Sequence, residues 1–111
     1  MSSIFTKIIR NEIPTQRVLE DENCLAIHDI APQAPIHILI FPKKEIKDFQ
    51  ELDAQSMQNL LSFIQKVAQT LNLDKNGYRL ITNVGRDGGQ EVPHIHFHLL
   101  GGAKLKWEKL A

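Results

Sequence analysis

The chain has 111 residues, 42% of them apolar, which is enough to build one globular domain around a real hydrophobic core. Its 13 basic and 13 acidic side chains give a formal net charge of zero, so the overall charge gives no reason to expect nucleic acid or a membrane as a partner. The single cysteine, Cys24, excludes an internal disulfide framework, and residues 1–14 hold no apolar run long enough for a signal peptide or membrane span, so we expect a cytoplasmic protein.

In chain order, the first predicted element is a short helix that follows Ser3 through residues 4–10. Three short runs of strand type come next, at residues 17–21, 24–30 and 36–42. Their spacing is that of strands joined by hairpin-scale connections.

A long amphipathic helix is predicted within residues 52–73. Apolar side chains recur there at intervals of three and four, at Met57, Leu60, Leu61, Ile64, Val67, Ala68 and Leu71. Asp53 can accept hydrogen bonds from the first free backbone N–H groups and is the expected N-cap. Asn76 and Gly77 are expected to stop the helix.

Two more strands are expected after this helix, at residues 78–84 and 94–100. Five short strands, one long helix and one short helix predict an α+β fold with a mostly antiparallel sheet. We expect residues 1–111 to form a single domain.

The last predicted strand contains His94, His96 and His98 at every second position. Side chains alternate across a strand, so these three imidazoles are expected on one face. Ile95, Phe97 and Leu99 would then point the other way, toward the long helix. A solvated strand face ordinarily uses Lys, Glu, Thr and Ser, which makes a functional row the better interpretation.

Two kinds of chemistry suit a row of histidines. Three imidazoles could hold Zn²⁺, but same-face neighbours on a strand are about 6.5–7 Å apart, so the three rings converge poorly on one ion. Successive roles along an extended substrate fit the spacing better, with one imidazole attacking or moving a proton and its neighbours orienting it.

A glycine-rich loop precedes the row. Gly85, Gly88 and Gly89 can aim consecutive backbone N–H groups at an anion, for which a phosphate is the obvious candidate, although such loops are often only hairpin connections. Pro93 lacks an N–H and restricts φ, so it belongs at the start of a strand and would stiffen the junction.

The segment "HIHFHLL" resembles the signature of the histidine triad (HIT) family. Further segments resemble its nucleotide-binding, Hint-like branch in the same order: "IFTKIIRNEIP", "HDIAPQAPIHILIFPKK", "GYRLITNVGRDGGQ" and "LLGG". The similarity covers nearly the whole chain.

This resemblance implies a HIT-like fold, usually paired into a homodimer with a continuous sheet. It also implies a site for purine nucleoside monophosphates and hydrolysis at the α-phosphorus of adenylyl or guanylyl compounds, typically phosphoramidates. AMP or GMP and an amine would be the products. The chemistry of the family requires no metal and no other cofactor.

The resemblance also implies catalytic roles. His96 resembles the nucleophile that forms a covalent nucleotidyl-imidazole intermediate, and the backbone carbonyl of His94 would hold the other ring nitrogen of His96 in its protonated form. His98 would bond the phosphate and leaving-group region. His37 matches a further family histidine and is expected to support the triad, or else to be a core histidine with a satisfied hydrogen bond.

The same resemblance implies a nucleotide-binding set. Asp29 matches the acidic residue that binds the ribose hydroxyls, and Asn83 matches a side chain near ribose and phosphate. Gly89 and the backbone of residues 90–92, including Glu91 and Val92, resemble the phosphate cradle. The apolar wall around the base would comprise Ile4, Phe5, Ile8, Ile27, His28 and Ile30, most of which the sequence alone would assign to ordinary core.

Three positions qualify the resemblance. Glu91 stands where several relatives have a serine that can contact phosphate, and its carboxylate would repel the anion unless it points away. Glu45 stands where related sequences often have histidine, and we expect it to be an inconsequential surface residue. Trp107, the only tryptophan, lies in a tail that either reaches a partner's site or seals a dimer interface.

Three classes of function therefore stay open. The favoured one is a nucleoside phosphoramidate hydrolase, with a dinucleoside polyphosphate hydrolase as a variant. The second is a nucleotide-binding or interaction protein with vestigial catalysis. The third is a metal-binding module.

Overall fold

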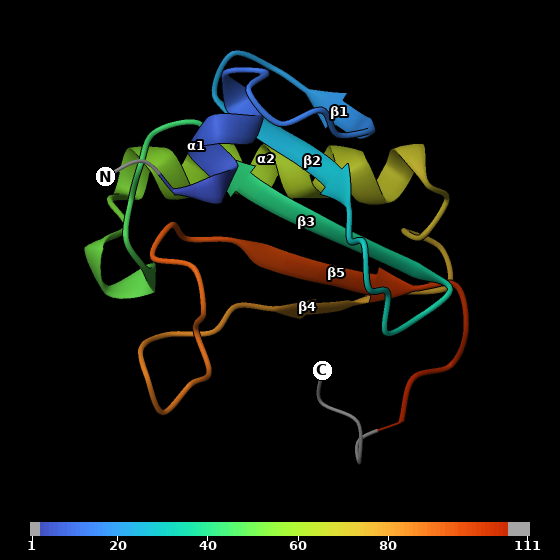
Figure 1. The fold of residues 1–111 in the computed structure, drawn as a ribbon. Coiled ribbons are helices and arrows are strands. Elements are labelled where there is room, and N and C mark those ends of the chain that lie inside the picture. Colours follow the sequence, from blue (N-terminus) through green and yellow to red (C-terminus); the bar gives the residue numbers. More distant parts are fainter. Residues whose placement is uncertain (1–2, 107–111) are drawn as a thin grey trace.

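The computed structural model describes residues 3–106, which form a five-stranded antiparallel sheet with helices on both faces (Figure 1). Helix α1 spans Ile4–Ile9, and helix α2 spans Ala54–Thr70 after a 3-10 turn at Phe49–Glu51. The strands are β1 (Arg17–Glu20), β2 (Cys24–His28), β3 (Ile36–Pro42), β4 (Arg79–Ile81) and β5 (Phe97–Gly101).

The order of strands across the sheet is β1-β2-β3-β5-β4, and every neighbouring pair is antiparallel. The predicted α+β fold is confirmed, and so are all five strands. Four of them are shorter than predicted, most of all β4, which covers only residues 79–81 of the expected 78–84. The 82–96 segment leaves the sheet and returns to it at Phe97, so it is free to build a loop beside the strands.

Helix α2 covers one face of the sheet (Figure 1). The side chain of Asp53 accepts a hydrogen bond from the Ser56 N–H at 3.0 Å, which confirms the predicted N-cap. The helix packs through its buried side chains, which are Leu60, Phe63, Ile64, Val67 and Ala68. Leu61 is 50% exposed, so the apolar stripe includes Phe63 where the sequence suggested Leu61.

The predicted stop of this helix at Asn76 and Gly77 is wrong, because the helix ends earlier. Asn72 adopts a left-handed φ of 59°, and the N–H of Leu73 bonds the Ala68 carbonyl at 2.8 Å while that of Asn72 bonds Gln69 at 3.1 Å. This pair of bonds is the Schellman pattern, and asparagine tolerates the left-handed conformation that it needs.

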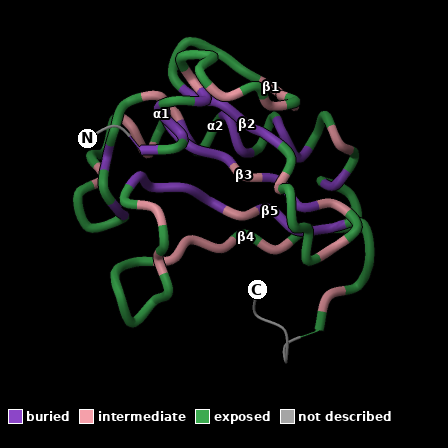
Figure 2. The backbone as a smooth tube through the Cα atoms, viewed as in Figure 1, coloured by how far each residue is buried: buried purple, intermediate pink, exposed green. Residues whose placement is uncertain are grey.

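The sheet separates two apolar clusters. The cluster under α2 includes Cys24, Ala26, Ile38, Ile40, Ile95, Phe97 and Leu99, whereas the cluster under α1 contains Phe5, Ile8, Leu25, Ile27 and Phe41. Alternate residues of β2 and β3 therefore face opposite ways, toward one cluster or the other, and most residues of both strands are buried (Figure 2). Within residues 3–106 no helix is long and apolar enough to cross a membrane.

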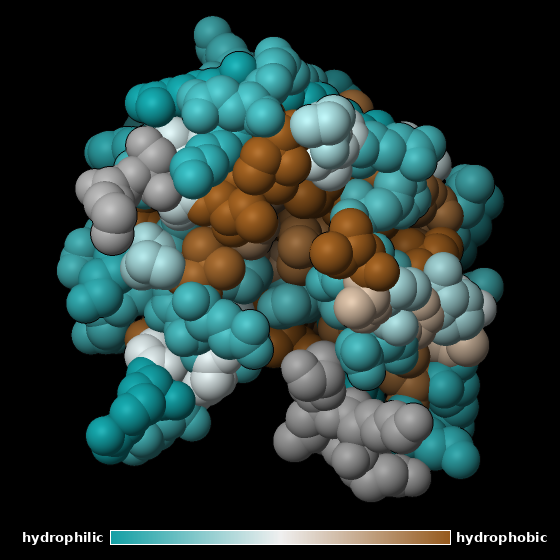
Figure 3. Space-filling model, viewed as in Figure 1, coloured by the Kyte–Doolittle hydropathy of each residue, from teal (hydrophilic) through white to brown (hydrophobic). Residues whose placement is uncertain are grey.

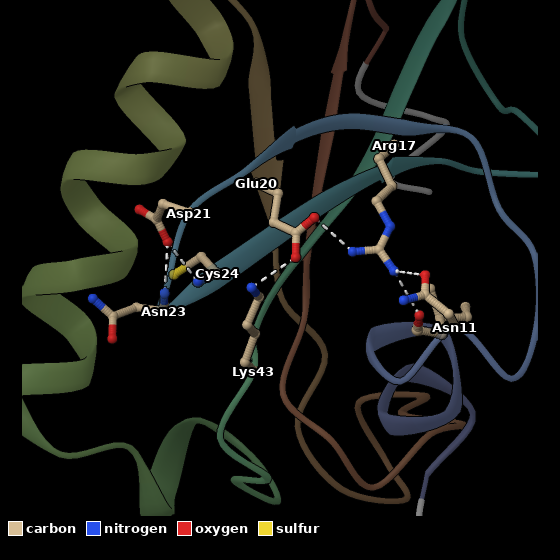
Figure 4. A network of polar contacts seen from close by, with 8 residues as sticks. Asn11, Arg17, Glu20, Asp21, Asn23, Cys24 and Lys43 are labelled. Carbon is tan, nitrogen blue, oxygen red and sulfur yellow. Dashed lines mark hydrogen bonds and ion pairs between the residues drawn. The ribbon is translucent and has the colours of Figure 1, made fainter.

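Cys24 is fully buried at the start of β2. Burial, with a smaller contribution from the nearby Asp21 carboxylate, raises the pKa of its thiol to about 12. The side chain of Asp21 accepts the N–H groups of Asn23 and Cys24 at 2.7 Å each and so closes the β1–β2 turn (Figure 4).

A polar network joins α1 to the edge of the sheet (Figure 4). The guanidinium of Arg17 donates to the Ile8 carbonyl at 2.8 Å, to Asn11 Oδ1 at 2.7 Å and to Glu20 Oε1 at 2.6 Å. Lys43 contacts the other oxygen of Glu20 at 2.7 Å. Hydrogen bonds from Lys43 and then Arg17 lower the pKa of the Glu20 carboxyl. Arg17 thereby holds the last turn of α1 against β1.

Replacing Arg17 with alanine is expected to lower the free energy of unfolding by about 1–3 kcal/mol, since the Ile8 carbonyl loses a charged donor. Urea unfolding followed by circular dichroism measures the change. Arg86→Ala is the matched control, because the ion pair of Arg86 with Asp87 is 95% and 91% exposed and should contribute almost nothing. Equal midpoints for the two variants would contradict the role given to Arg17.

Candidate active site

The three histidines at 94, 96 and 98 lie where the chain re-enters the sheet. Only His98 belongs to β5, so the predicted strand through His94 and His96 is wrong; a bend runs over residues 92–94, beside Pro93. The alternation persists all the same, because Ile95, Phe97 and Leu99 pack in the cluster under α2. The imidazoles lie on the other side, where the His96 ring is 5.3 Å from that of His98 and 5.0 Å from that of Phe5.

His94 is fully buried and both of its ring nitrogens are engaged. Nε2 lies 2.8 Å from the Pro42 carbonyl, which can only accept, so Nε2 carries the hydrogen. Nδ1 lies 2.7 Å from the Ser3 hydroxyl. Burial, as the largest cause, lowers the pKa of His94 and keeps the ring neutral. His94 therefore has a structural place in the row and no nitrogen left for a ligand.

The tautomer of His96 follows from one contact. Its Nδ1 lies 2.9 Å from the backbone carbonyl of His94, so Nδ1 carries the hydrogen and donates it. The neutral ring then has its lone pair on Nε2. Thr82 Oγ1 donates to the carbonyl of His96 itself at 2.8 Å and steadies the backbone at this point. His96 is 9% exposed, so only a small part of the residue reaches the surface.

His98 is held by a second chain of hydrogen bonds. The Gln33 N–H donates to His37 Nδ1 at 3.0 Å, so neutral His37 carries its hydrogen on Nε2 and donates it to His98 Nδ1 at 2.9 Å. Asp29 Oδ2 lies 3.4 Å from the same His37 nitrogen. His98 is thereby left with its own hydrogen on Nε2.

His37 and His98, the two histidines of this hydrogen-bonded chain, are both neutral at pH 7. Burial lowers the pKa of His98 to about 4, with smaller contributions from His96 and His37 and an opposing one from Asp29. Burial also lowers the pKa of His37 against the opposing charge of Asp29. Because His37 is neutral and its Nε2 hydrogen is donated to His98, the 3.4 Å approach of Asp29 is a close polar contact and not an ion pair.

A metal could be considered at Asp29, His37 and His98, whose candidate ligand atoms all lie within 4.8 Å of one another. The ring of His37 does not fit this role, because the Gln33 N–H occupies Nδ1 and puts the hydrogen on the nitrogen that would face the ion. The zinc alternative for the row itself fails at His94, whose nitrogens are both engaged. The cluster has the pattern of a hydrogen-bond relay.

The loop before the row is built by glycines and one glutamine. Gly85 and Gly89 have φ of 66° and 77°, and a Cβ on Gly88 would lie 2.3 Å from the Val84 carbonyl oxygen. The amide of Gln90 accepts from the Gly85 N–H at 3.0 Å and donates to the carbonyls of Lys47 and Val92 at 2.7 and 2.9 Å. These side-chain contacts of Gln90 were not predictable, because a lone glutamine after two glycines carries no sequence signal for them.

The expected phosphate cradle is only partly available. The N–H groups of Gly89 and Gln90 already bond the Arg86 and Gly85 carbonyls at 3.0 Å each, and the Asn83 amide donates to the Gly88 carbonyl at 2.7 Å. Among residues 3–106, the N–H groups of Glu91 and Val92 have no such partner. Glu91 itself is exposed and lines a cavity with Glu45 and Glu51.

The six residues expected to form the wall around a base divide into two groups. Phe5, Ile8 and Ile27 are buried in the cluster under α1, as the sequence alone suggested for most of the set. Ile4, His28 and Ile30 are exposed, Ile30 by 99%. On the face of the molecule that Figure 3 shows, apolar side chains gather around the middle and polar side chains surround them. Asp29, next to Ile30, is half-buried, and its Oδ1 accepts the Ala31 N–H at 2.8 Å.

Two further predictions concern positions away from the row. Glu45 is exposed as expected, but it is not without contacts, since its Oε1 accepts the Ser3 N–H at 2.9 Å. Trp107 lies outside the described residues.

Comparison with known proteins gives a consistent result. A model of the HIT domain matches residues 10–105. An uncharacterised HIT-like protein of Helicobacter pylori is 45% identical over 102 residues, 92% of this chain and 98% of that protein. The structure of a HIT family hydrolase from Legionella pneumophila is 47% identical with a TM-score of 0.90, covering 96% of this chain and 97% of that one. A histidine triad nucleotide-binding protein from Candida albicans is 33% identical with a TM-score of 0.83, covering 99% and 85%.

Proposed function

The chain belongs to the HIT family, and from this premise we propose that it is a nucleotide hydrolase that cleaves phosphoramidates of purine nucleosides at the α-phosphorus. The Legionella relative is described as a hydrolase and the Candida relative as a nucleotide-binding protein, which supports the general class. The products proposed here are AMP or GMP and a free amine.

The observation that carries the proposal is the hydrogen bond from His96 Nδ1 to the His94 carbonyl. It leaves the lone pair of a neutral imidazole on Nε2, which is the form that can attack phosphorus. In the proposed first step a bond forms from His96 Nε2 to phosphorus while the P–N bond breaks, and its electron pair leaves with the nitrogen, which takes up a proton. Water then attacks phosphorus and the bond from phosphorus to His96 Nε2 breaks, which regenerates the free imidazole. Over the two steps, the OH of water is added to phosphorus and its other hydrogen balances the one that the amine gained.

His98 is proposed to steady the reacting group from the other side. The relay through His37 leaves a hydrogen on His98 Nε2, and this N–H is a suitable donor to a phosphate oxygen or to the leaving nitrogen. The free N–H groups of Glu91 and Val92 are the proposed remainder of the phosphate cradle, with the Glu91 carboxylate pointing away. Asp29 is proposed to accept the ribose hydroxyls, and Phe5, Ile8 and Ile27 to support the base from below.

Release of AMP from adenosine 5′-phosphoramidate in the presence of EDTA tests the proposal. We expect turnover, incorporation of one oxygen from labelled water into AMP, and a nucleotidylated chain in alkaline-quenched samples. AMP binding without turnover would favour a nucleotide-binding protein instead. Faster cleavage of a diadenosine polyphosphate than of the phosphoramidate would favour the polyphosphate variant.

We also propose that the chain pairs into a homodimer. β4 is an edge strand, and it presents an exposed Leu80 between Tyr78 and Val84, which are exposed as well. An edge strand of this kind can pair with a second copy about a two-fold axis. Sedimentation velocity should give a mass twice that of one chain, and Leu80→Lys should shift this mass toward that of a single chain. Leu61→Lys, at an exposed leucine of α2, is the matched control and should leave the dimer intact.

A further inference from the structure

The hydroxyl of Ser3 joins the start of α1 to the histidine row. Ser3 is buried, and its Oγ caps the helix by accepting the Thr6 N–H at 3.1 Å. The same oxygen lies 2.7 Å from Nδ1 of His94, a residue 91 positions away in the chain. A helix cap alone requires no such contact, since Asp53 caps α2 without touching the site.

The hydrogens in this cluster can be assigned. Nε2 of His94 donates to the Pro42 carbonyl, so the neutral ring has its lone pair on Nδ1, and the Ser3 hydroxyl must donate to it. Thr6 Oγ1, at 3.2 Å, then donates to Ser3 Oγ. The backbone N–H of Ser3 is held by Glu45. Every polar hydrogen of Ser3 is therefore committed to one partner.

His94 depends on this contact for its orientation. It lies before the β5 ladder begins, and its ring is fixed at one end by Pro42 of β3 and at the other by Ser3 of the α1 cap. The carbonyl of the same residue is the acceptor that determines the tautomer of His96. A displacement of the ring that is transmitted to the backbone of His94 would therefore also move this acceptor.

We propose that Ser3 is a positioning residue for the reaction, which acts through the ring and carbonyl of His94 to hold His96 with its lone pair aimed at phosphorus. The inference rests on the proposed function. Loss of the hydroxyl leaves Nδ1 of a fully buried ring without its donor, and a buried polar atom without a partner is costly enough to shift the ring. Small displacements of a reacting group reduce rate steeply.

The experiment compares Ser3→Ala, Ser3→Thr and Asp53→Ala with the wild-type chain. Ser3→Ala is expected to lower kcat for adenosine 5′-phosphoramidate about 10- to 100-fold with little change in KM. Ser3→Thr keeps both the cap and the donor and should recover most of kcat. Asp53→Ala removes the N-cap of α2, which contacts none of the histidines. This variant should lower the free energy of unfolding and leave kcat unchanged. All variants are assayed well below their melting temperatures.

Nitrogen-15 spectra of the imidazoles give a readout that simple loss of stability would not move. In the folded wild type, His96 should show a protonated Nδ1 and an unprotonated Nε2, whereas in Ser3→Ala the two signals should approach each other as the tautomers mix. Unchanged kcat and unchanged His96 signals in Ser3→Ala would overturn the inference while wild-type turnover upholds the function. Absence of wild-type turnover under all conditions would overturn both.

Discussion

Replacing His96 with alanine is expected to lower turnover of adenosine 5′-phosphoramidate by on the order of 10⁴-fold or more, because the chain loses the only atom proposed to form a bond with phosphorus. AMP release at saturating substrate measures the loss. Binding of AMP should survive, since the proposed contacts to the base come from α1 and β2, and the proposed contact to the ribose comes from Asp29, just after β2. The nucleotidylated chain should no longer form.

A second variant separates lost chemistry from lost structure. His96→Gly leaves space where the ring was, and free imidazole added to the assay should restore part of the turnover by supplying the missing nucleophile. Substantial turnover by His96→Ala, or a nucleotidylated adduct on another residue, would remove His96 from the role given to it and would direct attention to His98.

Stability is expected to fall in mild acid because of the buried histidines. The pKa of His98 is about 4 in the folded chain against an ordinary 6.5, so the unfolded state binds more protons between these values. The contribution of His98 is fully present above pH 6.5 and is lost as the pH falls toward 4. Protonation linked to His98 alone should lower the free energy of unfolding by about 2 kcal/mol between pH 7.5 and pH 5. The lowered pKa values of His37 and His94 act in the same direction.

Urea unfolding at pH steps between 7.5 and 5 measures this slope, above the range in which Glu20 and Asp53, with their lowered pKa values, begin to take up protons. His98→Asn should flatten the slope. High salt should leave it nearly unchanged, since burial and not long-range charge is the main cause. A stability independent of pH over this interval would mean that the rings are more hydrated than the structure indicates.

Much of the fold could be predicted from local pattern. The period of α2, its Asp53 cap and the inward side of Ile95, Phe97 and Leu99 follow from the spacing of apolar residues and the alternation of a strand. The end of α2 could not, because Asn72 and the Asn76-Gly77 pair are both good stops, and the choice was made by the packing of Leu73 in the core.

The candidate site was predictable in its histidines, and the family resemblance also implied the contact of the His94 carbonyl with His96, but other contacts that hold the histidines were not predictable. Ser3 and Gln90 are ordinary polar residues in the sequence, and their contacts with His94 and with Gly85, Lys47 and Val92 exist only after distant segments meet. The family resemblance also placed Ile4, His28 and Ile30 in a base wall, yet in this structure these residues are exposed. A wall made from them requires a ligand or a partner to cover it.

The buried thiol of Cys24 makes the chain its own reporter of unfolding. It is the only cysteine, it has no exposed surface, and its pKa of about 12 leaves almost no thiolate at neutral pH. An alkylating reagent can therefore reach it only when the structure around the start of β2 opens. The labelling rate then follows the population of such openings, and a ligand that binds the folded chain slows the labelling. No engineered probe has to be introduced to measure this rate.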